Sequence, residues 1–192
     1  DLGDACNDFT GGVERIGLPA YMWLVETNTG VAANCIAPGN CGTKFTGALS
    51  LGASFNRTSW RKKGQVMGRE SRAYMNVNWH RGAGGLGAYI SLTAYGPNIN
   101  NQRDPRFGRS SELPGEDPFL SGSYGAEYVG GMMEEDEQGR PAVLAYIKHF
   151  TAYSRETDRG HDDYNISMHD LYESYLPQFK LVWDANPSLG AM

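Results

Sequence analysis

Short, almost continuous apolar runs alternate along the chain with longer stretches in which apolar residues recur every three or four positions. The continuous runs predict buried strands, and the periodic stretches predict helices with one apolar face. The strands are expected at residues 20–25, 89–95 and 142–147. The helices are expected at residues 57–76, 118–133 and 169–184.

This alternation of strand and helix is typical of α/β proteins with a parallel sheet, and above all of a (β/α)8 TIM barrel. A barrel of this kind has eight strands and usually about 250 residues. With 192 residues and three strong strand signals, the chain is expected to form only part of such a barrel. The sequence shows no linker or internal repeat, so residues 1–192 are expected to form a single domain.

A highly charged segment, residues 96–118, follows the second predicted strand. It contains three arginines, four acids and four prolines. Prolines fix backbone angles and glycines permit turns, so this segment is expected to be an ordered loop. Loops that follow buried strands often bind ligands in α/β proteins. On pattern alone, a salt-bridged surface loop is an equal alternative.

Polar side chains that could hold a sugar follow each predicted strand. Glu26, Lys148 and His149 end the first and third strands, and Arg109 lies in the loop after the second. In a barrel, these strand ends meet on one face. Carboxylates accept hydrogen bonds from sugar hydroxyls, whereas Arg, Lys and His donate to them. The alternatives are a surface acid at Glu26 and a solvated strand end at residues 148–149.

Composition excludes two classes of partner. The net charge of -5 disfavours nucleic acid, because binding to phosphates needs clustered Lys and Arg. The compact basic group at residues 61–63 is expected on a solvated helix face. No apolar run approaches the ~20 residues that cross a bilayer, so no membrane segment is expected.

Cysteines and glycosylation sequons favour a secreted protein. Cys35 and Cys41 flank a short loop and could form a disulfide, which would leave Cys6 without a partner. Asn56 and Asn165 each begin an Asn-x-Ser/Thr sequon. The first residue is Asp1, and the start shows no signal-peptide pattern, which fits a mature and a truncated product equally well.

Two further patterns do not predict a cofactor or metal site. Residues 82–87 match G-x-G-x-x-G, but a dinucleotide site needs a strand before the glycines and a helix after them, and here the order is reversed. His and Asp residues cluster between positions 149 and 169, but their spacing matches no known ligand set. The expectation is that neither a cofactor nor a metal is required.

Several motifs resemble those of glycoside hydrolase family 3. Residues 96–120 are similar to its signature loop, PN-x-N-x-x-RDPRWGR-x-x-E-x-PGEDP-x-L, with Phe107 in place of the usual tryptophan. Residues 147–150 (IKHF) are similar to its CKHF or AKHF motif. Residues 21–31 resemble the Y-x-W-W-x-EALHGV stretch of its β-xylosidase branch. The resemblance covers nearly the whole chain but only the first part of the family's catalytic barrel.

The resemblance implies roles for individual residues. Lys148, His149 and Arg109 match residues that hold the sugar before the scissile bond, and Glu26 matches a sugar-binding acid. Family members are retaining enzymes, which implies two carboxyl groups about 5 Å apart. The family's nucleophile follows a later strand, and its acid/base lies in the next domain, so no catalytic residue is expected within this chain. The acids at positions 112, 116 and 117 are expected to be structural.

The implied function is hydrolysis of O-glycosyl bonds that releases terminal β-linked xylose from oligo- or polysaccharides. Arabinose and glucose are alternative sugars. Glu26 favours a pentose, because the β-glucosidase branch usually has the shorter Asp, and Glu would crowd an exocyclic CH₂OH group. The remainder of the chain's own polypeptide is the expected partner. A non-catalytic carbohydrate-binding protein and a fragment without a ligand remain open as alternatives.

Overall fold

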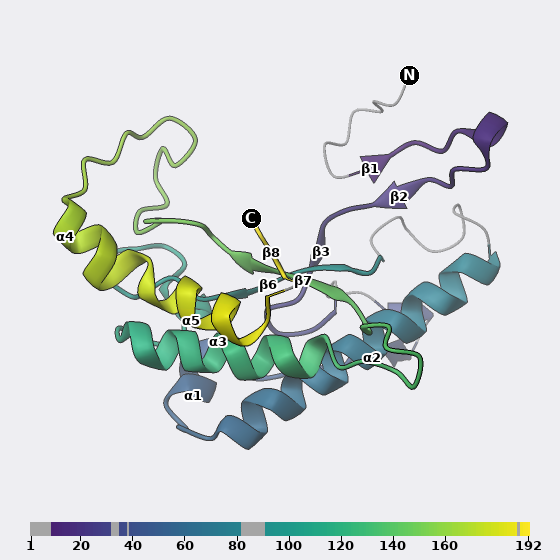
Figure 1. Ribbon diagram of the computed structural model, residues 1–192, viewed down its shortest axis with the longest axis horizontal. Helices are drawn as coiled ribbons and strands as arrows, with labels where there is room; N and C mark the ends of the chain where they lie inside the picture. The colour runs from purple at the N-terminus through teal and green to yellow at the C-terminus, as the bar shows by residue number, and fades with distance from the viewer. Residues whose placement is uncertain (1–8, 32–34, 38, 82–90, 188) are drawn as a thin grey trace.

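The computed structural model describes residues 9–31, 35–37, 39–81, 91–187 and 189–192. Its centre is a parallel four-stranded sheet in the order β3 (Val25–Glu26), β6 (Thr93–Asn98), β7 (Leu144–Lys148) and β8 (Gly190–Ala191). Helices α2 (Arg57–Arg81), α3 (Pro118–Met132) and α5 (Pro177–Ala185) lie on one side of this sheet (Figure 1). The predicted α/β class with a parallel sheet is confirmed.

The first predicted strand, residues 20–25, is divided into two. β2 (Tyr21–Met22) pairs antiparallel with β1 (Phe9–Thr10), whereas β3 joins the parallel sheet. Between them, the hydroxyl group of Thr93 donates a hydrogen bond to the carbonyl of Trp23. The two halves pair with different partners, and the prediction of one continuous strand is wrong.

β6 continues past the predicted strand end into residues 96–98, where the sequence predicts a loop. Residues 89–90 of the predicted strand lie outside the described residues. The register shifts within β6, because Tyr95 and Gly96 both lie opposite Tyr146. A Cβ atom at Gly96 would lie 2.7 Å from Thr27 Oγ1. Glycine therefore lets β6 approach the turn that follows β3.

Capping residues mark the starts of the two long helices. Asp117 precedes α3, and its carboxylate accepts hydrogen bonds from two backbone N–H groups of the first turn. Pro118 occupies the first helical position, and the helix matches its predicted bounds to within one residue. Asn56 Oδ1 accepts a backbone N–H at the start of α2 with a distance of 3.0 Å. This helix continues to residue 81 and so is longer than predicted.

The third predicted helix, residues 169–184, is interrupted. It comprises α4 (Met168–Asp170), the wider-turned η3 (Leu171–Tyr175) and α5. The interruption lies before Pro177, which has no backbone N–H with which to continue the hydrogen-bond ladder. The sequence therefore predicted the segment correctly but not its division.

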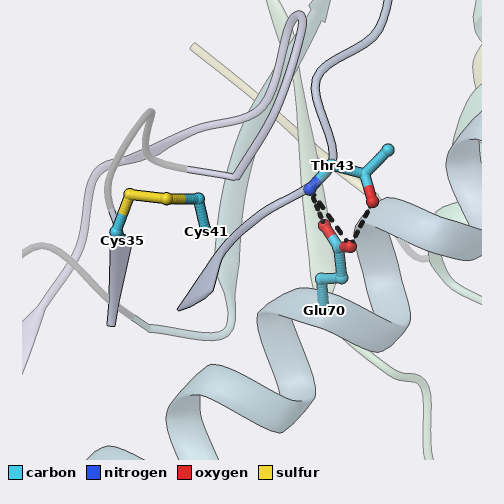
Figure 2. Close-up of a disulfide and its surroundings, with 4 residues drawn as sticks. All are labelled: Cys35, Cys41, Thr43 and Glu70. Carbon is cyan, nitrogen blue, oxygen red and sulfur yellow. Dashed lines mark hydrogen bonds between the residues drawn. A yellow bond between two sulfur atoms is a disulfide. The ribbon is translucent and has the colours of Figure 1, made fainter. Parts of the chain in front are cut away.

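Residues 27–52, predicted as a loop, contain two short strands and a short helix among the described residues. β4 (Cys35–Ala37) and β5 (Asn40–Cys41) form a hairpin, and α1 (Ala48–Gly52) follows it. Figure 2 shows that a disulfide joins Cys35 to Cys41. It also shows the Glu70 carboxylate of α2 accepting hydrogen bonds from the backbone N–H and the hydroxyl group of Thr43. The hairpin is thereby anchored to α2, while Cys6 lies outside the described residues.

The core lies between the sheet and the helices, and α2 and α3 pack with their backbones in contact. A Cβ atom at Gly64 would lie 2.1 Å from the carbonyl oxygen of Tyr128, so only glycine permits this approach. The predicted apolar stripe of α3 is confirmed, since Tyr124, Tyr128 and Met132 are fully buried. None of the described helices is both long and apolar enough to cross a membrane.

One sequence expectation about α2 is wrong. Residues 61–63 were expected on a solvated face, but only Arg61 and Lys62 are exposed. The Lys63 side chain is 1% exposed, and its ammonium group donates to the backbone carbonyl of Asn28 and to the hydroxyl of Tyr124. Helical periodicity places residue 63 on the inner face, and these polar partners permit its burial.

Candidate functional site

The four residues expected to bind sugar lie at the carboxyl ends of adjacent strands. Glu26 ends β3, Lys148 ends β7, and His149 directly follows Lys148. β6 lies between β3 and β7 in the sheet. Arg109 lies in the loop after β6, directly before the short helix η2 (Ser110–Glu112). Parallel pairing therefore brings residues 122 positions apart into contact.

Glu26 and Lys148 form an ion pair across the sheet. The Lys148 ammonium group lies 2.5 Å from Glu26 Oε2, and its side chain is only 3% exposed. The Glu26 side chain is 45% exposed, because it lies at the rim of the sheet. Its second oxygen, Oε1, is itself buried and has no hydrogen-bond partner among the described residues. Lys148 therefore orients a carboxylate that retains a free acceptor.

Arg109 and Glu112 form a two-point ion pair. The Nε and Nη2 atoms of Arg109 each lie 2.7 Å from a different oxygen of Glu112. η2 places these residues one turn apart, so the pair forms locally. Burial alone would raise the pKa of the Glu112 carboxyl, but the hydrogen bonds and charge of Arg109 outweigh it and hold the pKa below its usual value. Both oxygens of Glu112 are therefore engaged.

His149 lies beside the Arg109 guanidinium group, with 3.4 Å between its Nε2 atom and Arg109 Nη1. Burial, reinforced by the charges of Lys148 and Arg109, lowers the pKa of His149 to about 3. The imidazole is therefore neutral at neutral pH. Arginine only donates hydrogen bonds, so Nε2 is the acceptor, and we assign the proton to Nδ1. No described residue is a hydrogen-bond partner of Nδ1.

The backbone of His149 is fixed by Asn100. Asn100 Oδ1 accepts the N–H of His149, and Asn100 Nδ2 donates to its carbonyl, both at 2.8 Å. On the other side, the Tyr153 ring lies 5.1 Å from the imidazole and 5.0 Å from the ring of Phe107. The Arg109 guanidinium carbon lies 5.7 Å from the same Tyr153 ring. The Tyr153 ring thus packs against the side chains of both His149 and Arg109.

Sequence reasoning missed several residues that build the site. Asn28, Asn100 and Tyr153 were not selected, and Glu112 was expected to be structural but was not assigned to Arg109. Glu112 could have been found from its i,i+3 spacing to Arg109. Asn28 and Asn100 act through contacts distant in sequence, and Tyr153 contacts the nearby His149 as well as the distant Phe107 and Arg109. The Asp117 carboxylate caps α3 instead of facing these residues.

The remaining sequence expectations concern positions away from the site. No group of His, Cys, Asp and Glu suited to a metal ion occurs in the part of the chain that the structure describes. The glycine motif at residues 82–87 lies outside that part. Asn56 and Asn165 are both exposed, although the Asn56 side chain also caps α2.

Comparison with known proteins gives consistent matches over nearly the whole chain. Residues 8–189 match the sequence model described as "Glycosyl hydrolase family 3 N terminal domain". The chain is 37% identical over 188 residues to a β-xylosidase/α-L-arabinofuranosidase of Medicago sativa subsp. varia, covering 91% of this chain and 23% of that protein. The chain thus spans about a quarter of the length of the curated relatives it matches.

Solved structures show the same relationship. A GH3 exo-β-xylosidase (XlnD), in complex with a xylobiose aziridine probe, matches with a TM-score of 0.76 and 33% identity, over 89% of this chain and 22% of that one. β-Glucosidase 3B from Thermotoga neapolitana, in complex with α-D-glucose, matches with a TM-score of 0.75 and 30% identity, over 96% of this chain and 23% of that one.

Proposed function

The chain belongs to glycosyl hydrolase family 3, and we propose that it supplies the sugar-binding half of the active site of a retaining hydrolase that releases terminal β-linked xylose. The sheet is then an arc of the family's N-terminal TIM-type barrel, as the sequence predicted. The other half of the site belongs to the remainder of a longer polypeptide. Oligo- or polysaccharides with a xylose at the non-reducing end are the proposed substrates.

One observation carries this proposal. Glu26 Oε1 is a hydrogen-bond acceptor and His149 Nδ1 a donor, and neither has a partner among the described residues. Glu26 lies at the carboxyl end of β3 and His149 at that of β7, the two strands that flank β6, and Lys148 and Arg109 contact them there. A fixed acceptor and a fixed donor at the same edge of the sheet suit the hydroxyl groups of a pyranose ring. Fixed groups of this kind bind with little loss of side-chain entropy.

The four residues divide the work of binding. Glu26 accepts a hydroxyl hydrogen, and the buried Lys148 fixes the orientation of its carboxylate. His149 donates a hydrogen bond from Nδ1. Its imidazole is neutral, and the contact of Nε2 with Arg109 keeps the proton on Nδ1. Arg109, held by Glu112, provides positive charge beside the sugar. None of these roles transfers a proton or forms a covalent bond.

The chemical step requires two carboxyl groups about 5 Å apart, one on each side of the scissile bond. Glu112 does not suit the role of nucleophile, because both of its oxygens accept hydrogen bonds from Arg109. By resemblance to the family, the nucleophile is an aspartate in a later Ser-Asp-aromatic motif, and the acid/base lies in the following domain. The proposed division of labour is therefore binding in this chain and catalysis outside it.

We also propose that the protein is secreted and glycosylated. The Cys35–Cys41 disulfide suits an oxidising compartment. Both sequon asparagines, Asn56 and Asn165, are exposed and so accessible to modification. Mass measurement of the protein from its natural source, before and after removal of N-linked glycans, tests this proposal. An unchanged mass would contradict it.

Titration of the chain with xylose, followed by two-dimensional NMR, tests the binding function. We expect shifts at Glu26, Arg109 and His149, with an affinity on the order of 1 mM. Arg109→Ala should abolish these shifts. Arg106→Ala is the matched control, because Arg106 belongs to the same loop but is 89% exposed and pairs with Asp104. Equal loss in both variants, or no binding at all, would contradict the proposal.

The coding sequence after Met192 separates the enzyme from the alternative of non-catalytic carbohydrate binding. An open reading frame that continues into an apolar strand with a Ser-Asp-aromatic motif supports hydrolysis. A stop codon at that point would rule out the family's mechanism for this product. Sugar binding would then be the whole function.

A further inference from the structure

We propose that Asn28 is a positioning residue that fixes the Arg109–Glu112 pair relative to Glu26. This inference rests on the proposed sugar-binding function, and it names a residue that touches no sugar itself. Asn28 lies two positions after Glu26, in the turn that follows β3. The group that orients Glu112 thus lies in the turn directly after the strand that ends in the sugar acceptor Glu26.

Both polar atoms of the Asn28 side-chain amide form hydrogen bonds. Asn28 Nδ2 donates to Glu112 Oε2 at 3.0 Å, and Asn28 Oδ1 accepts the backbone N–H of Asn98 at 2.9 Å. The same Glu112 oxygen accepts from Arg109 Nη2. One amide therefore connects the turn after β3, the end of β6 and the carboxylate that holds Arg109. Rotation of Glu112 would break its bond to Asn28.

The turn that bears Asn28 is itself fixed from the helical layer. The Tyr128 hydroxyl of α3 donates to the carbonyl of Thr27, and the Lys63 ammonium group of α2 donates to the carbonyl of Asn28, each at 2.5 Å. Both side chains are almost completely buried. Two successive carbonyls are thus held by two different helices. Because the turn is held in place, the hydrogen bond from Asn28 also holds Glu112 in place. A side chain on a mobile turn could not fix Glu112 in this way.

An asparagine can be replaced here by a residue of nearly the same shape with the opposite hydrogen-bonding character. Asn28→Asp keeps an acceptor for the N–H of Asn98 but removes the donor to Glu112. It also sets a carboxylate beside the Glu112 carboxylate, whose other charged neighbours are Arg109 and Lys148. Like charges at this distance raise a carboxyl pKa. The substitution therefore targets the orientation of Glu112 without leaving a cavity.

The test has two readouts in the 192-residue chain. The first is the pKa of Glu112, followed by carbon-detected NMR without sugar, and the second is the xylose dissociation constant. In Asn28→Asp we expect the pKa to rise and xylose affinity to fall about tenfold. Asn28→Ala, which adds no charge, should weaken xylose binding by a similar factor. Unchanged values of both quantities in a folded Asn28→Asp chain would overturn the proposal.

Asn186→Ala is the control for a merely structural effect. Asn186 also donates through its amide, to the carbonyls of Ala126 and Val182, but it lies at the end of α5. The Asn186→Ala substitution should lower the melting temperature of the chain and leave its xylose affinity unchanged. If the wild-type chain binds no xylose while the Glu112 pKa still rises in the uncharged Asn28→Ala, through loss of the Asn28 donor, the sugar-binding function fails and the positioning role stands.

Discussion

The Lys63 ammonium group lies 2.5 Å from the backbone carbonyl of Asn28, in the turn directly after Glu26. Its charge is almost completely removed from water, and burial lowers the pKa of Lys63 to about 8. The Tyr128 ring, 4.9 Å from the same nitrogen, provides a further favourable contact. A charged group normally found on the surface thus supports a binding site from the inside.

Lys63 should make stability depend on alkaline pH. Its folded-state pKa lies below the unfolded value of 10.5, so the unfolded chain binds more protons between about pH 8 and pH 10.5. The stability of the wild type relative to Lys63→Met should therefore rise with pH across this window, by at most about 1.4 kcal/mol per pH unit. Urea unfolding at several pH values measures this difference.

Lys62→Met is the matched control, because Lys62 is the exposed neighbour of Lys63 on the same helix. Its stability relative to the wild type should not vary with pH over the same range. A difference between wild type and Lys63→Met that stayed constant from pH 8 to pH 10 would show that Lys63 retains its ordinary pKa in the folded chain.

His149 should destabilise the fold in acid. Its pKa is lowered to about 3, whereas an unfolded histidine titrates near 6.5. The unfolded chain therefore binds an extra proton as the pH falls from about 6.5 to about 3, and stability is lost over that interval. The loss attributable to His149 is at most about 1.4 kcal/mol per pH unit.

Unfolding curves of His149→Asn and the wild type, recorded from pH 7 to pH 4, check this prediction. The variant should lose less stability than the wild type. His161→Asn, at an exposed position, should follow the wild type. Parallel curves for wild type and His149→Asn would contradict a buried neutral imidazole.

Shortening Glu26 should change which sugar is preferred. In Glu26→Asp the carboxylate withdraws by one methylene group and makes room for the exocyclic CH₂OH of glucose. The ratio of glucose to xylose affinity should rise roughly tenfold, as is usual for one methylene in a pocket. NMR titrations with both sugars measure this ratio. Glu116→Asp, at an exposed position in the signature loop, is the control and should leave the affinity ratio unchanged. If the ratio does not change in Glu26→Asp, the argument for a pentose is removed.

The Cys35–Cys41 disulfide should contribute to stability through the short loop that it closes. The two residues are six positions apart, and a loop of this size contributes about 2 kcal/mol to the free energy of unfolding. Cys35→Ser/Cys41→Ser should therefore melt at a lower temperature than the wild type. A reducing agent should lower the melting temperature of the wild type to that of the double variant.

Elements governed by neighbouring residues could be predicted from the sequence. The bounds of α3 follow from Asp117, Pro118 and the apolar spacing after them, and all of these act within a few residues. The strand at residues 20–25 was predicted incorrectly because strand pairing depends on distant partners. The hydroxyl of Thr93, 70 positions away, bonds to Trp23 between β2 and β3.

The sequence by itself determined the α/β class, the family and the four residues expected to bind sugar, because periodicity and motif spacing are properties of the linear chain. Only the tertiary structure decided how those residues are held. The pairing of β3, β6 and β7 joins Glu26 to Lys148, and the helical layer places Lys63 behind Asn28. These contacts depend on strand register and helix packing, which no local pattern encodes. In the sequence, a lysine that the fold buries cannot be distinguished from a surface lysine, because its partners are distant in the chain.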